Sequence, residues 1–321
     1  MFMPLRLPLA LAILPLLSPG LDQVGIESRT GLSYELRMTR TMSMRLGEAS
    51  MMVGGQEFPA DMVRGSVPDR DDLETVVLRN VVKQAEEGRP VQVLREFVEL
   101  TMRKTVADET TEQTGALEGM QLLLERGEDG EVEARFEDDE GSVLDDVYLL
   151  GHLLEHGIHM FMPEGPVELG ESWTPDDEAV RALLLSPGPQ YYGTTRSAEL
   201  PSLLRDVAKF SAEMTLREIV ELDAVECYRL ELRVDLEAEV DELPAEFSSG
   251  DQASEGNMQV AGEHRGELWI AVETAFPVKF EIESEWTFDI EMNVDQEGMV
   301  IEINMELIAN NTSSREWEIL E

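Results

Sequence analysis

Residues 278–294 read VKFEIESEWTFDIEMNV, a stretch in which apolar and polar residues alternate. Its apolar residues are Val278, Phe280, Ile282, Trp286, Phe288, Ile290, Met292 and Val294, and Ser284 is the one polar residue at these positions. Successive side chains of a β-strand point to opposite faces, so this period of two predicts a strand with one apolar and one acidic face. Residues 295–298 read as a turn, after which the alternation resumes from Met299 to Leu307. The region therefore predicts a long antiparallel hairpin.

Further strands are predicted along most of the chain, and the period of two recurs in several of them. They cover residues 32–46, 73–84, 91–106, 120–125, 132–136, 210–222, 225–240 and 258–274. The first of these strands is interrupted by Arg40, which stands where an apolar residue is expected. The segment 73–84 also fits a helix after an Asp71-Asp72 cap, but its valines favour a strand.

The middle of the chain has a different pattern. From residue 143 to residue 160 the apolar residues follow helical spacing, and Ser142 is placed to cap a helix. An edge strand is predicted over 167–173 and a short helix over 176–185. We therefore expect a single β-rich domain over residues 21–321 with a helical insert at about 143–207.

The length of the predicted strands decides the architecture. Strands of this length reach about 50 Å at roughly 3.3 Å per residue, so they must bend to enclose a compact core. We expect an α+β, mostly β fold: a long curved antiparallel sheet, or half-barrel, whose concave apolar face is covered by the central helical segment. This architecture resembles that of bacterial periplasmic lipoprotein carriers.

A second resemblance rests on a succession of short segments. They are Gly88-Arg89-Pro90, the hairpin with Asp129-Gly130, the helical stretch, Pro163, Val167, Gly170 and Ser172-Trp173. In this order they resemble uncharacterised exported proteins of planctomycete-type bacteria. No activity follows from that resemblance.

The composition limits the possible partners. The chain has 321 residues, of which 25 are basic and 67 acidic, giving a net charge of −42. Such a charge repels phosphate backbones and excludes nucleic acid as a main partner. The acidic residues are expected to face water and to attract cations without a defined site, since no stretch matches a calcium-binding loop.

The N-terminus predicts export. Residues 1–20 contain Arg6 followed by an apolar run from Leu7 to Leu17, which is typical of a secretory signal peptide. No later segment is apolar enough to predict a transmembrane helix. The expected location is therefore periplasmic or extracellular. The single cysteine, Cys227, permits no intrachain disulfide.

One short motif predicts a metal site. Residues 152–156, His-Leu-Leu-Glu-His, match H-x-x-E-H. On a helix, His152 and His156 share one face and can bind zinc, while Glu155 can act as general base. The motif resembles that of pitrilysin-type metallopeptidases, which implies a third glutamate ligand at Glu226 or Glu231. The segments that follow the motif in that family are missing here. We therefore favour the interpretation that these histidines belong to a helix packed on the sheet, and keep the zinc site as the alternative.

We expect a non-enzymatic exported protein without a cofactor, whose curved sheet holds a lipid or other amphiphile. The residues predicted to line the cavity are Phe280, Ile282, Trp286, Phe288, Tyr228 and Leu230. For the methionines Met38, Met42, Met44, Met51 and Met52, we favour ordinary core packing over the alternative that they line an adaptable cavity. The alternatives are a zinc metallopeptidase and an envelope structural or interaction protein.

Overall fold

The structure is a computed structural model that describes residues 28–65, 67–127, 130–137, 144–154, 161–163, 165–185, 191–192, 203–243, 254–296 and 299–320. The predicted signal peptide lies outside these ranges. Within them, no helix has both the length and the apolar character needed to cross a bilayer.

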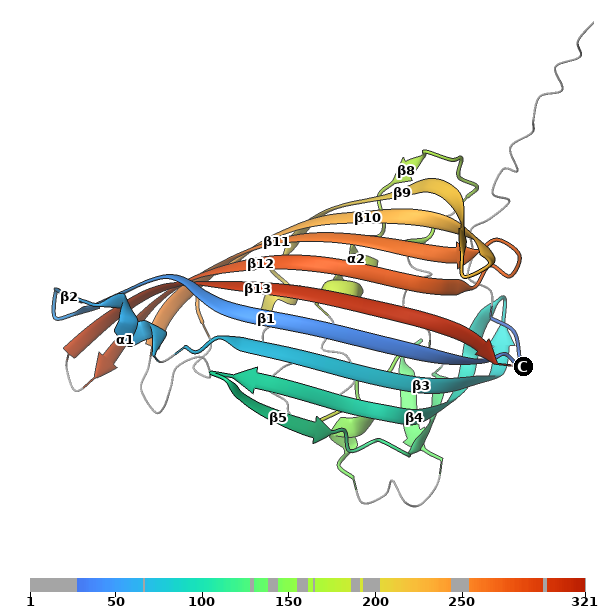
Figure 1. Cartoon of the computed structure of the whole chain (residues 1–321), viewed down its shortest axis with the longest axis horizontal. Coiled ribbons are helices and arrows are strands. Elements are labelled where there is room, and N and C mark those ends of the chain that lie inside the picture. Colours follow the sequence, from blue (N-terminus) through green and yellow to red (C-terminus); the bar gives the residue numbers. More distant parts are fainter. Residues whose placement is uncertain are drawn as a thin grey trace, which may run out of the picture.

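The described chain forms one antiparallel sheet of thirteen strands (Figure 1). The strands are β1 (Ser33–Val53), β2 (Gln56–Phe58), β3 (Arg70–Glu86), β4 (Arg89–Val106), β5 (Glu109–Thr114), β6 (Gln121–Arg126), β7 (Val132–Phe136), β8 (Ser172–Trp173), β9 (Lys209–Leu222), β10 (Val225–Val240), β11 (Ser254–Ala271), β12 (Pro277–Gln296) and β13 (Met299–Leu320). Their order is β7-β6-β4-β3-β1-β13-β12-β11-β10-β9-β8, with β2 paired to β1 and β5 paired to β4. The first and last long strands, β1 and β13, are therefore neighbours in the middle of the sheet.

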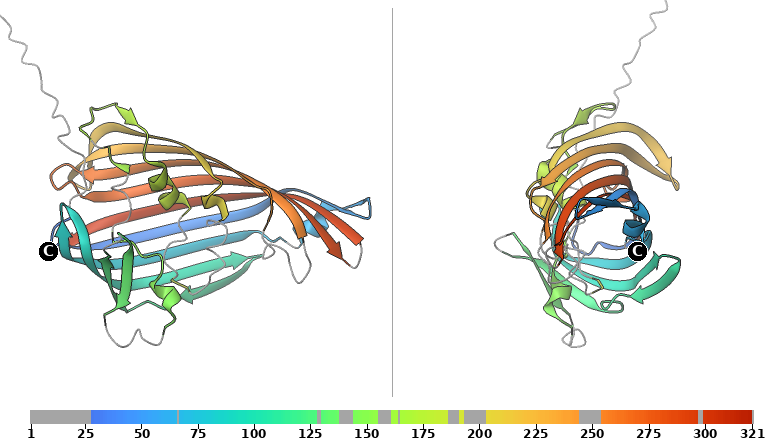
Figure 2. Two further views of the ribbon diagram at one scale, coloured as in Figure 1. Left: turned by 180° about the vertical axis from the view of Figure 1, so that it is seen from behind. Right: turned by 90° about the vertical axis from the view of Figure 1, so that its left-hand side faces the viewer.

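The sheet is open, twisted and curved, and the middle segment lies on one side of it (Figure 2). We call that side the inner face. Its side chains alternate with acidic ones on the outer face, as the sequence predicts. In β10, for example, Leu232 and Val234 are each 1% exposed, whereas Arg233 and Asp235 between them are exposed. The mostly β, antiparallel character of the fold is confirmed.

Two apolar clusters cover the inner face. The first core cluster is centred on Leu36, Leu78 and Phe97, all fully buried, and it includes Leu154 and Val180 from the middle segment. The second core cluster is formed chiefly by Leu236, Ala238, Met258, Val260, Phe288, Ile290 and Ala309, with Leu185 and Leu204 packed on them. The middle segment thus covers parts of both clusters.

The long helix expected over 143–160 is not found in the described part of that segment. Residues 144–154 contain only the 3-10 turn η2 (Asp146–Leu149), after which Leu150 is extended. Gly151 follows with φ of +76°, a left-handed conformation that favours glycine and ends a helix. Residues 143 and 155–160 lie outside the described ranges. The expected helical cover of the sheet is not shown.

Two other predictions from the sequence, the short helix before residue 186 and the strand over 73–84, are confirmed. The short helix expected over 176–185 is confirmed as α2 (Asp177–Leu184), capped by Asp176, whose Oδ1 accepts a hydrogen bond from the Glu178 amide at 2.7 Å. Residues 73–84 belong to strand β3 and not to a helix. Three features were not predicted: β5, the continuation of β1 beyond residue 46 to Val53, and the short helix α1 (Ala60–Arg64).

The first core cluster predicts a stability difference within one strand. Leu36→Ala removes a fully buried side chain, and we expect a loss of about 2–5 kcal/mol in the free energy of unfolding. Thr41→Ala, at an exposed position on the other face of β1, is the matched control, with an expected change within about 0.5 kcal/mol. Urea unfolding of both variants measures the difference. Equal losses would contradict the assignment of the two faces.

Candidate functional site

A band of polar residues crosses the inner face between the two core clusters. We call it the polar band, and it consists of His264, Ser284, Asn311, Ser313, Arg40, Glu74, Asp72 and Lys104. The strand register brings them into two adjacent rows: Ser284 lies between His264 and Asn311, and Arg40 lies between Ser313 and Glu74. Arg40 and Ser284, which interrupt the alternation of their strands in the sequence, thus lie close together in the fold.

Arg40 is the most accessible charge of the polar band. Its side chain remains exposed although it points to the same face as the buried Leu36, and its Nε donates to Oδ1 of Asn311 at 3.3 Å. Glu74 is its direct neighbour on β3. Burial raises the pKa of Glu74, an effect that Arg40 opposes and Asp72 reinforces. Asp72 is itself held by Arg70, whose Nε lies 2.9 Å from Oδ1 of the carboxylate.

His264 is buried on the inner face. It is 1% exposed, and neither ring nitrogen has a hydrogen-bond partner among the described residues. Its imidazole packs edge-to-face on Trp286 with 4.7 Å between ring centroids, and it fills the space above Gly262, where an added Cβ would lie 2.9 Å from Nε2. Burial lowers the pKa of His264 to about 4, although Asp235 raises it.

Two more arginines point to the inner face. Arg95 is 1% exposed, and it donates from Nε to Oδ1 of Asn80 at 2.8 Å and from Nη2 to the carbonyl of Leu153 at 2.9 Å. The guanidinium of Arg315 lies 5.8 Å from the ring centroid of Phe280. Burial lowers the pKa of both arginines. Burial also raises the pKa of Tyr191 to about 12, against the opposing effects of Arg95 and Arg315.

Next to the polar band lies a half-buried apolar surface, which we call the apolar wall. It consists of Met42, Met44, Trp286, Met305 and Leu307, all facing inward on β1, β12 and β13. All but Met42 pack at the margin of the second core cluster. Trp286 also stacks on Phe288 at 6.0 Å between centroids. The wall is therefore a partly accessible apolar surface beside accessible charges.

The six residues predicted to line a cavity all lie on or near the inner face, but they have different environments. Leu230, Phe280 and Ile282 are buried in the first core cluster, with exposures of 0%, 3% and 5%, and Phe288 is buried in the second. These four are packed core residues. Tyr228 and Trp286 are partly buried, and Trp286 alone among the six belongs to the apolar wall.

The predicted zinc motif is described only at its first histidine. His152 is 4% exposed, packs against the rings of Phe97 and Tyr191, and has Nε2 at 2.9 Å from the Tyr148 carbonyl. Burial lowers the pKa of His152 to about 4, and the positive charge of Arg95 contributes to this decrease. Glu155 and His156 lie outside the described residues. Among the residues that are described, no group of three His, Cys, Asp or Glu side chains could hold a metal ion.

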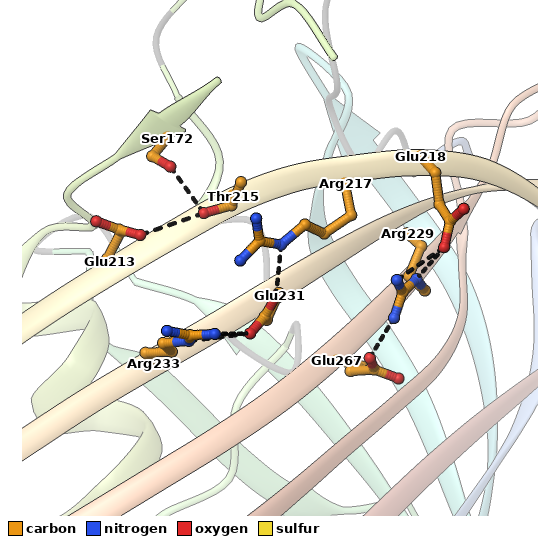
Figure 3. A network of polar contacts seen from close by, with 9 residues as sticks. All are labelled: Ser172, Glu213, Thr215, Arg217, Glu218, Arg229, Glu231, Arg233 and Glu267. Atoms are coloured by element: carbon orange, nitrogen blue, oxygen red, sulfur yellow. Dashed lines mark hydrogen bonds and ion pairs between the residues drawn. The ribbon is translucent and has the colours of Figure 1, made fainter. Parts of the chain in front are cut away.

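Neither glutamate implied as a third zinc ligand forms a metal-binding group with His152 among the described residues. Glu231 is on the outer face, where it forms ion pairs with Arg217 and Arg233 at the centre of a charged network (Figure 3). Hydrogen bonds from these two arginines lower its pKa. Arg229 bridges Glu218 and Glu267 in the same network. Glu226 is exposed near the start of β10.

A small pocket of about 240 Å³ lies on the outer face, near the turn between β9 and β10. It is lined by charged residues that largely pair with one another: Lys279 Nζ lies 2.8 Å from Glu281 and 3.9 Å from Glu316, and Arg37 lies 3.9 Å from Glu35. These ion pairs leave few free groups for a ligand. The inner face is therefore the stronger candidate, although its accessible part is open and not an enclosed cavity.

No known protein-family model matches the chain, and no curated protein matches it in sequence. The site must therefore be judged from its own chemistry.

His264 predicts a pH effect on stability. Its pKa in the fold, about 4, is below the usual value of about 6.5, so the unfolded chain binds more protons between these values and stability falls as the pH falls through this window. In His264→Phe this contribution disappears, and the loss of stability between pH 6.5 and 4 should be smaller by up to about 3 kcal/mol.

Urea unfolding at several pH values measures this slope. His264→Gln is the matched control for polarity, because it keeps a buried polar group but does not titrate. It should share the shallower slope, and a slope like that of the unaltered protein in both variants would contradict the buried, neutral state of His264.

Proposed function

We propose that the protein is a non-enzymatic exported protein that binds a lipid or other amphiphile on the inner face of its sheet, the face that the sequence analysis expects to be concave. The observation that carries the proposal is the half-buried apolar wall directly beside the accessible polar band. An amphiphile needs these two surfaces side by side. Ligand sites are mostly apolar with a small number of placed polar groups, which is the composition found here.

The chemistry of the apolar wall favours an adaptable ligand surface. Met42, Met44 and Met305 have flexible, polarisable side chains that adjust to ligands of different shape, and Trp286 adds a flat aromatic surface. These residues are only half-buried, in contrast to the fully packed Leu36 and Phe97 of the first core cluster. A ligand lying on the wall would remove further apolar area from water, which contributes about 25 cal/mol per Å².

The middle segment supplies a cover in this proposal. Leu154 and Val180 bury apolar area of the first core cluster, whereas the wall at the margin of the second remains partly accessible. The proposal thus retains the resemblance in architecture to periplasmic lipoprotein carriers. Export rests on the predicted signal peptide at residues 1–20. The metallopeptidase alternative has less support, since His152 is already packed and hydrogen-bonded.

Two neighbouring residues of β13 test the binding surface. Leu307 faces the inner side and Ile308 the outer side, and both are half-buried. With the neutral fluorophore 1-aminoanthracene as probe, Leu307→Glu should weaken binding by more than about tenfold, because a carboxylate would have to be desolvated at the apolar wall.

Ile308→Glu introduces the same charge one residue away on the other face, and its affinity for the probe should stay within about twofold of that of the unaltered protein. Probe fluorescence measures both affinities, and circular dichroism checks the fold. If the unaltered protein fails to bind the probe, or if both variants lose it equally, the binding proposal fails and an envelope structural or interaction role replaces it.

A further inference from the structure

The charges around the polar band have the opposite balance to the protein as a whole. On the six adjacent long strands β4, β3, β1, β13, β12 and β11, five basic side chains and two carboxylates point to the inner face. The basic residues are Arg40, Arg70, Arg95, Lys104 and Arg315, and the carboxylates are Asp72 and Glu74. Two further carboxylates, Glu221 and Glu226, share this face at the paired ends of β9 and β10. The whole chain carries 25 basic and 67 acidic residues. A positive balance around the polar band in a protein with a net charge of −42 points to an anionic ligand group.

Asp72 and Glu74 leave two of these cations, Arg40 and Lys104, without an ion pair. Asp72 is bound by Arg70 in a two-point contact, so it is not free to pair with Lys104, its neighbour on β4. Neither Lys104 nor Arg40 forms an ion pair with any residue that the structure describes. Glu74 lies opposite Arg40 on β3, and burial raises its pKa. Arg40 and Lys104 therefore retain charge that a ligand can use.

The accessibility of Arg40 decides where a ligand group could bind. Arg95 is fully enclosed by its protein partners, whereas Arg40 is exposed and, among the described residues, has one hydrogen bond, from its Nε to Asn311. Met42, two residues further along β1, belongs to the apolar wall, so Arg40 lies at its edge. A group bound by Arg40 would leave an attached alkyl chain directly over the wall.

We propose that the polar band is the head-group site of the inner face, in which Arg40, supported by Lys104 and the amide of Asn311, binds the carboxylate or phosphate of an anionic amphiphile. This inference rests on the proposed function and specifies the class of ligand. The guanidinium of Arg40 offers planar, two-point hydrogen bonding that fits both carboxylate and phosphate groups. The alkyl chain of the ligand lies on Met42, Met44 and Leu307.

A tyrosine near the band adds a further donor. The Tyr192 hydroxyl is buried and has no hydrogen-bond partner among the residues that the structure describes, which is a costly state for a donor. The residue packs at the margin of the first core cluster, and Gln113 of β5 donates to its backbone carbonyl at 3.5 Å. The nearby charge of Glu74 adds to burial in raising its pKa, so the hydroxyl keeps its proton and can donate to an anion.

The acidic outer face explains why the ligand should be an amphiphile and not a free anion. The field of the outer carboxylates opposes the approach of any anion, although salt screens it over about 8 Å at physiological ionic strength. A small anion gains only the contacts of the polar band, whereas an alkyl chain adds burial on the apolar wall. Both parts of the site are then needed for binding.

Three probes with the same chain length separate the contributions: dodecanol, dodecanoate and dodecyl phosphate. In the unaltered protein the two anionic probes should bind about tenfold more tightly than dodecanol, because charge-assisted hydrogen bonds to Arg40 are available to them alone. Arg40→Gln should abolish this preference and leave the affinity for dodecanol within about twofold. Isothermal titration calorimetry below the critical micelle concentration of each probe measures all three affinities.

Arg45→Gln is the matched control, since Arg45 is an exposed arginine of the same strand on the outer face, and it should retain the preference. If Arg40→Gln does not fold, Lys104→Gln takes its place, with a smaller loss expected. Tighter binding of dodecyl phosphate identifies a phosphate head group, and tighter binding of dodecanoate a carboxylate.

The outcomes distinguish this inference from the proposed function. Equal binding of all three probes by the unaltered protein, or a preference that survives Arg40→Gln, overturns the head-group site but leaves an amphiphile-binding surface intact. Failure of the unaltered protein to bind any of the three probes overturns the proposed function itself.

Discussion

The whole structure depends on the strand register that keeps apolar side chains on one face of a very long sheet and carboxylates on the other. Because side chains alternate with a period of two, a slip by one residue between β12 and β13 would exchange the faces of eighteen paired positions. The outer face adds a constraint of its own, since Glu231, Glu267 and Glu281 lie directly opposite one another on adjacent strands. Arg217, Arg233 and Arg229 form ion pairs with the first two of these glutamates and relieve this repulsion.

Most of this sheet could be predicted from the sequence because alternation is a local property of each strand. The predictions failed where the deciding factor was not periodicity. β5, with the sequence ETTEQT, buries no side chain and has no apolar residue to mark a face, so only its pairing with β4 makes it a strand. Residues 144–154 have helical spacing, but Gly151 adopts a left-handed conformation, and Leu154 is drawn into the first core cluster. In this segment, tertiary packing overrides the local preference for a helix.

The residues of the polar band could likewise be predicted only in part from the sequence. Arg40 and Ser284 were visible as departures from alternation, but their proximity depends on the order of β1, β13 and β12, which no single strand reveals. The sequence did not mark His264 as a polar residue on the apolar face, because it stands among Gly, Glu and Arg residues in a strand with weak alternation. The cavity-lining residues were predicted from their apolar character alone. Packed core residues such as Leu230 and Phe280 share that character with partly accessible residues such as Trp286, so the sequence does not separate the two groups.

Buried polar groups of the inner face also cost stability that the protein could have avoided. A chain with 67 acidic residues has ample means to place a carboxylate beside each inward cation, yet Arg95 is buried with only neutral partners among the described residues. His264 of the polar band likewise has no hydrogen bond from either ring nitrogen to a described residue, and an apolar residue there would remove the penalty. Unsatisfied polar groups of this kind concentrate where function opposes stability. Their presence on the inner face is the physical reason to prefer this face, and not the charge-paired pocket of the outer face, for the proposed binding site.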